Sequence, residues 1–172
     1  MGSDRTQGLT ARLIAALLAL AAPAAAQETG WNYSPLPGEG DRATLGCALE
    51  STRDSFTCLA VRCEDDFNIG VHIYTSRPQG NVGDWAITVD KETRMFSAEA
   101  SKPYGAKLVG DYSWVTTNLL NGAVAYLEPA DGSAMPANHI PLDGSLYAIN
   151  RALAFCAPRI PDPVEPKAAP GV

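Results

Sequence analysis

The sequence lacks the short motifs on which many catalytic and cofactor sites depend. It contains neither G-x-G-x-x-G nor G-x-x-x-x-G-K, the glycine-rich loops that cradle phosphates. No C-x-x-C pair is present, and the spacing between Cys58 and Cys63 is not that of a zinc knuckle. We therefore predict no metal site, no cofactor and no catalytic residue, and expect a non-enzymatic domain.

Basic residues are scarce relative to acidic ones. The chain has 13 Lys and Arg against 19 Asp and Glu, a formal net charge of −6. Such a surface repels the phosphate backbone of nucleic acids, and no stripe of basic residues reverses that repulsion. We expect a protein or a cell-envelope component as partner, and no nucleic acid.

Long apolar runs are absent except at the N-terminus. Arg5 and Arg12 accompany an apolar stretch at 13–22, and Ala24-Ala-Ala26 supplies the small residues of a cleavage site before Gln27. This pattern predicts a signal peptide over 1–26 and a periplasmic or secreted mature chain. No later run is long enough for a transmembrane segment.

The remaining chain divides by composition into three parts. Residues 27–42, rich in proline, glycine and charge, are expected to form a lead-in segment with little regular structure. Residues 43–157 have the length and apolar content of a single α+β domain. Residues 158–172 contain five prolines and few large apolar side chains, which predicts a disordered tail.

Alternating apolar and polar residues predict a series of strands. Ile69, Val71 and Ile73 share one face of the segment 68–76, whereas His72 and Tyr74 share the other, where a partly exposed histidine is expected. The other expected strands share the same β-branched and aromatic character. They span 43–50, 55–63, 85–90, 94–101, 106–112, 123–128 and 137–142.

Two helices are expected among these strands. A short one, capped by Ser113 or Thr116, ends at Gly122. A C-terminal helix begins with Ser145 as N-cap and carries an apolar stripe toward the sheet. The members of that stripe are Leu146, Ile149, Leu153 and Cys156. The sequence thus predicts an α+β fold, mostly an antiparallel meander or sandwich, with a mid-chain helix and a C-terminal helix packed on the sheet.

Two sets of residues are candidate sites. His139, Asp143 and Ser145 are the three residue types of a hydrolase triad, but no nucleophile-elbow motif surrounds Ser145, whose expected role is a helix cap. The acidic run 64–66 offers oxygen ligands for Ca²⁺ without the spacing of a calcium loop, so a solvated turn is the favoured interpretation. A small hydrolase using carboxylates or His139 stays as an alternative.

Four cysteines in an exported chain indicate two disulfides, for which three pairings exist. A turn near Arg53 sets Cys47 opposite Cys58 on neighbouring strands. Cys58 and Cys63 are five residues apart on one strand, so their side chains point to opposite faces. We predict Cys47–Cys58 and Cys63–Cys156, the second bridge joining the helix to the sheet.

Three stretches resemble the small exported VasI-like proteins associated with type VI secretion. They are Leu59-Ala-Val-Arg-Cys63 with its acidic turn, Asn118-Leu-Leu-Asn-Gly122 before a strand, and Ile140-Pro-Leu-Asp-Gly144 leading into a helix that closes on Cys156. The resemblance covers about 45–156 and also points to the Cys63–Cys156 bridge. The pair Cys47 and Cys58 departs from that pattern. The invasion-associated locus B family is a weaker resemblance.

Both families imply a β-rich envelope protein that acts by contact, and neither supplies a catalytic residue. We therefore expect an exported domain that binds a protein or an envelope component, and the resemblance implies an association with secretion or invasion. A periplasmic inhibitor of lysozyme or of another hydrolase, itself a small disulfide-bonded β protein, is a second form of the same hypothesis.

Overall fold

A computed structural model describes residues 30–33 and 36–157 of the chain. The predicted signal peptide, residues 27–29 and 34–35 of the lead-in segment, and the predicted tail lie outside the described residues. The strands are β1 (Gly30–Tyr33), β2 (Ala43–Cys47), β3 (Thr57–Cys63), β4 (Ile69–Thr75), β5 (Gly83–Val89), β6 (Glu92–Ala100), β7 (Ala106–Leu108), β8 (Val124–Pro129) and β9 (His139–Pro141). The helices are α1 (Ser113–Asn121), α2 (Ser145–Leu153), and the short 3-10 turns η1 (Gly40–Arg42) and η2 (Ala154–Cys156).

All these strands belong to one antiparallel sheet. Its order is β1-β2-β3-β4-β7-β6-β5-β8-β9, so β7 separates β4 from the β6–β5 hairpin. Together with a mid-chain helix and a C-terminal helix, this sheet confirms the predicted α+β fold of mostly β content.

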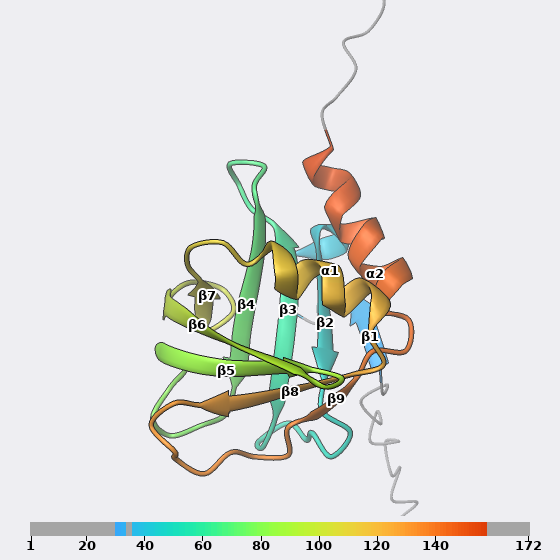
Figure 1. Ribbon diagram of the computed structural model, residues 1–172. Helices are drawn as coiled ribbons and strands as arrows, with labels where there is room; N and C mark the ends of the chain where they lie inside the picture. The colour runs from blue at the N-terminus through green and yellow to red at the C-terminus, as the bar shows by residue number, and fades with distance from the viewer. Residues whose placement is uncertain (1–29, 34–35, 158–172) are drawn as a thin grey trace, which may run out of the picture.

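The sheet curls until its two edges approach one another. In Figure 1 the strands β2, β3 and β4 run nearly crosswise to β5 and β8. At the closing side, Leu49 N–H donates to His139 O over 3.1 Å and Trp31 N–H donates to Asp143 O over 3.4 Å. The curl encloses the main core, where alternate residues of facing strands meet.

The core explains why the alternating strands form. Its largest fully buried members are apolar side chains from both halves of the sheet and from both helices. Leu59, Ile73, Trp85, Ile87, Leu127 and Ile149 are examples. The strand expected at 106–112 ends already at Leu108, because Gly110 adopts a positive φ of 79° and turns the chain toward α1.

The C-terminal helix α2 packs on β1, β2 and β3 and against α1, as expected. Its buried side chains are Ser145, Ala148, Ile149 and Ala152. Two expectations about it are wrong. Leu146 is 55% exposed, because the buried stripe of the helix runs through 145, 148, 149 and 152, and Leu146 lies outside it. The N-cap is Gly144, with φ 81°, and Ser145 already lies inside the helix.

The lead-in segment has more regular structure than its composition indicates. Strand β1 pairs with β2, and Trp31 is buried. Its indole ring lies over Gly46, where the Cβ atom of any larger residue would overlap the ring. The turn η1 follows. Backbone hydrogen bonds to β2 and the buried Trp31 fix this part of the lead-in segment on the sheet. Its glycine- and proline-rich composition therefore does not prevent regular structure.

The structure contains the two expected bridges, Cys47–Cys58 and Cys63–Cys156. Cys47 and Cys58 are register partners on β2 and β3, with Cα atoms 4.0 Å apart. The second bridge joins the end of β3 to η2 across 93 residues. No helix among the described residues has the length and apolarity needed to cross a membrane.

The two bridges differ in the length of chain that they close, which gives a testable order of importance. Loop-closure estimates for separations of 93 and 11 residues are about 4–5 and about 3 kcal/mol. Replacing Cys63 and Cys156 by serine is therefore expected to lower the free energy of unfolding in urea more than replacing Cys47 and Cys58. A larger loss for the Cys47–Cys58 pair contradicts this order.

Candidate functional site

The outer face of β2, β3 and β4 carries a second cluster of buried residues. Its apolar part consists of Ala43, Leu45, Cys58, Ala60 and Tyr104, with Leu36, Phe56 and Tyr74 packed at its border. Farther along the same face the residues become charged. This half of the sheet is thus covered on both sides, and its outer cover ends in polar side chains beside the β3–β4 turn.

Arg62 of β3 is the centre of the charged part. Its side chain is 7% exposed. Its Nε donates to Glu39 Oε2 over 2.6 Å, and its Nη1 donates to Glu64 Oε2. Burial alone lowers the pKa of Arg62, but the hydrogen bonds and charges of both carboxylates raise it above the ordinary value, so the guanidinium stays charged.

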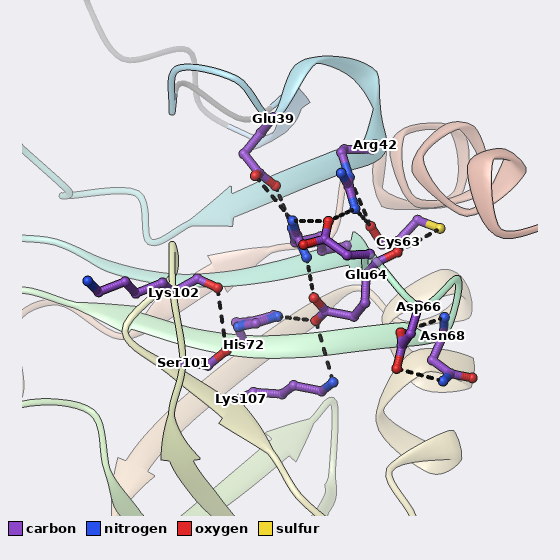
Figure 2. A network of polar contacts seen from close by, with 12 residues as sticks. Glu39, Arg42, Cys63, Glu64, Asp66, Asn68, His72, Ser101, Lys102 and Lys107 are labelled. Atoms are coloured by element: carbon purple, nitrogen blue, oxygen red, sulfur yellow. Dashed lines mark hydrogen bonds and ion pairs between the residues drawn. The ribbon is translucent and has the colours of Figure 1, made fainter.

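Glu64 connects Arg62 to two further side chains. Figure 2 shows its carboxylate between His72 of β4 and Lys107 of β7. His72 Nε2 lies 2.7 Å and Lys107 Nζ 3.6 Å from Glu64 Oε1. The carboxylate occupies the space over Gly70, where a Cβ atom would overlap it. We call Glu39, Arg62, Glu64, His72 and Lys107 the buried charge network.

The expectation of a partly exposed His72 is wrong, because its side chain is fully buried. An ionised carboxylate only accepts hydrogen bonds, so His72 donates to Glu64 from Nε2. Burial lowers the pKa of His72 below its ordinary value of 6.5, and the charge of Lys107 acts in the same direction against the opposing effect of Glu64. His72 is therefore neutral at pH 7.

Three charged residues in and beside η1 form ion pairs or hydrogen bonds with three other parts of the domain. Glu39, its N-cap residue, binds Arg62. Asp41 pairs with Arg151 of α2 over 2.8 Å. Arg42 donates to Cys63 O from Nε and Nη2, and its Nη2 lies 2.6 Å from Asp65 Oδ1. The lead-in segment is thereby attached to β3, to α2 and to the β3–β4 turn.

The acidic turn divides into one largely buried carboxylate, Glu64, whose side chain is 11% exposed, and two exposed ones. Glu64 belongs to the buried charge network, so the prediction of a wholly solvated turn is wrong for this residue. The hydrogen bond and charge of Arg42 lower the pKa of Asp65, and hydrogen bonds from Asn68 lower that of Asp66. No group of three His, Cys, Asp or Glu side chains within 30–33 and 36–157 is arranged to hold a metal ion.

A small hollow opens beside this turn. It measures about 260 Å³ and is lined by Arg42, Cys63, Glu64, Asp65, Phe67 and Phe155. Phe67 and Phe155 are 62% and 50% exposed. We call this the tip hollow, because in Figure 1 the β3–β4 turn projects beyond the sheet at the same end as the last turns of α2.

Phe67 stands in an unfavourable backbone conformation. The turn closes with Phe67 N–H donating to Glu64 O and Glu64 N–H donating to Asn68 O. Phe67 has a φ of 63°, the left-handed region where glycine or asparagine is favoured. The other described residue of this kind besides glycines is Asp90, an amino acid that tolerates the region.

The residues of the hydrolase alternative do not form a triad. Ser145 is buried, and its Oγ donates to Leu119 O over 2.6 Å. His139 is exposed, and its Nδ1 lies 3.3 Å from the hydroxyl of Tyr126. The proton of Ser145 is therefore engaged with a backbone carbonyl and not with the imidazole.

Comparison of the chain with known protein families, with curated proteins and with solved structures finds no match. The assignment of a site therefore rests on the geometry of this chain alone.

Sequence reasoning missed Arg62, Glu39 and the pairing of Glu64 with His72. One signal was present: Arg62 interrupts an otherwise apolar strand, and a charged residue in such a strand requires a buried partner. The identity of that partner depends on strand register and on η1, neither of which is contained in local periodicity.

His72 gives the site a pH dependence. Since its folded-state pKa lies below 6.5, the unfolded chain binds a proton first as the pH falls through that value. The free energy of unfolding is therefore unaffected by His72 above pH 6.5, where the histidine is neutral in both states, and it decreases as the pH falls below that value. Urea unfolding between about pH 7.5 and 5.5 should show this decrease for the wild type and for His139→Gln, and a flatter profile for His72→Gln. Equal slopes for wild type and His72→Gln contradict the prediction.

Proposed function

We propose that the chain is exported and that its domain acts by binding a protein or a component of the cell envelope. The signal-like N-terminus supports export, and two disulfides are typical of oxidising compartments. The resemblance to exported secretion-associated proteins supports the same compartment. The tip hollow and its two phenylalanines are the proposed contact surface.

The observation that carries the proposal is the conformation of Phe67. A left-handed φ destabilises a non-glycine residue by roughly 1–2 kcal/mol. Packing inside the domain does not offset this penalty, because the side chain of Phe67 is 62% exposed. Stability alone favours glycine or asparagine at this position, so an exposed phenylalanine here supports a role in contact with another molecule.

The backbone that carries Phe67 and Phe155 is held by bonds to the rest of the domain. Glu64, the first residue of the turn, is fixed by Arg62 and His72. Phe155 is next to Cys156, whose bridge attaches η2 to the end of β3. A backbone that is already held in one conformation loses little entropy on association, which favours affinity.

An inhibitor of lysozyme or of another hydrolase is the more specific candidate. The β3–β4 turn projects beyond the sheet (Figure 1), and a projecting turn that carries an exposed phenylalanine has a shape that can enter the cleft of an enzyme. The tip hollow itself is smaller than the roughly 300–1,000 Å³ typical of small-molecule sites. This size favours contact between macromolecules over turnover of a small substrate.

A photocrosslinking phenylalanine analogue in place of Phe67 tests the contact surface. Placed in the full exported chain and irradiated in the cell, it should join the domain to one protein or envelope polymer. Met95, on β6, is 58% exposed and provides a matched control position. An adduct at position 67 that is absent at position 95 is the expected result. No adduct at 67, or the same adducts at both positions, contradicts the proposal.

A further inference from the structure

We infer that the tip hollow accepts an arginine side chain from a basic segment of a partner protein. The inference rests on the proposed function and specifies the chemistry of the partner. It follows from the size of the hollow, from its aromatic walls and from the distribution of charge around it.

The size of the hollow matches a side chain. About 260 Å³ is too small for a typical small-molecule ligand, and the opening lies at the surface between two exposed rings. An extended side chain with an apolar stem can enter such a space while its backbone stays outside. The backbone beneath both walls is fixed before binding, by the hydrogen-bonded turn at Phe67 and by the disulfide beside Phe155.

The walls select for a planar cation. Phe67 and Phe155 offer aromatic faces, over which a guanidinium is attracted by the ring quadrupole. The molecule uses the same contact internally, since Arg94 lies 4.7 Å from the ring centroid of Trp114. Arginine also stacks its planar group and buries its methylene stem, which lysine does less well.

The charges around the hollow leave a carboxylate in excess. The cations Arg42, Arg62 and Lys107 face the carboxylates Glu39, Glu64, Asp65 and Asp66. Each of these cations already contacts a carboxylate, so none of them demands an incoming anion. Asp65 has a side chain that is 83% exposed and can accept a further hydrogen bond.

The net charge of the whole chain also favours a basic partner. A net charge of −6 attracts a basic segment over several ångströms and raises its rate of association. The same charge opposes anionic membranes and nucleic acids. A purely apolar partner would leave Asp65 and Arg42 at the hollow without new polar contacts.

Titration with short blocked peptides tests the inference on the folded, disulfide-bonded domain. The probes are Gly-Arg-Gly, Gly-Lys-Gly, Gly-Leu-Gly and Gly-Glu-Gly, followed by amide chemical shifts at millimolar peptide concentrations. We expect Gly-Arg-Gly to shift the amides of 64–68 and of Phe155 most strongly, with a weaker response at high salt. Gly-Lys-Gly should bind less tightly.

Phe67→Asn is the deciding variant. Asparagine tolerates the left-handed conformation, so the variant should fold, and loss of one cation–π wall should weaken arginine binding by roughly two- to fivefold. Met95→Asn, at a matched exposed position, should leave binding unchanged. Equal shifts with the leucine or glutamate peptide, unchanged binding by Phe67→Asn, absence of any shift at the tip, or binding of the domain to anionic lipid vesicles each overturns the inference.

The two experiments have separable outcomes. A Phe67-dependent crosslink without preference for the arginine peptide leaves the proposed function in place and removes only the inference. Absence of the crosslink removes both.

Discussion

A guanidinium buried between two carboxylates on the outer face of the sheet governs the arrangement of this domain. Arg62 takes its charge out of water, and its hydrogen bonds to Glu39, Glu64 and, more weakly, Asp65 offset that loss of hydration. Buried ion pairs of this kind add little net stability compared with apolar residues of similar volume. Their effect is geometric, since charged groups tolerate few alternative positions in a low dielectric.

The geometry of the proposed contact surface follows from that pairing. Glu39 brings η1 onto β3, and η1 then places Arg42 against Asp65 and the backbone of Cys63. Glu64 fixes the start of the turn that holds Phe67 in its left-handed conformation. The Cys63–Cys156 bridge adds Phe155 from the other side. An exposed aromatic pair is therefore held in place by polar and covalent bonds rather than by packing.

Local patterns in the sequence were sufficient for the strands from β2 onward, for the two helices and for the cysteine pairs, although not for β1 or for the end of β7. Period-2 alternation and the parity of Cys58 and Cys63 determine which face each side chain occupies. They were insufficient wherever a distant element decides burial. The exposure of Leu146 depends on how closely α2 approaches the sheet. The burial of His72 depends on the cover that Glu64 and Tyr104 provide. The contact surface itself depends on a turn conformation that phenylalanine normally disfavours.

The substitution Arg62→Met tests the central claim most directly, because it keeps a similar volume and removes the charge. Glu39 and Glu64 then lose their shared partner, and we expect a loss of about 3–5 kcal/mol in the free energy of unfolding. Hydrogen exchange should rise first in η1 and in 64–68, while β5 and β8 stay protected. Arg94→Met, which removes an exposed ion pair with Glu92 and a cation–π contact with Trp114, should change stability by about 1 kcal/mol or less. Unchanged exchange at η1 and the β3–β4 turn in Arg62→Met would contradict the account.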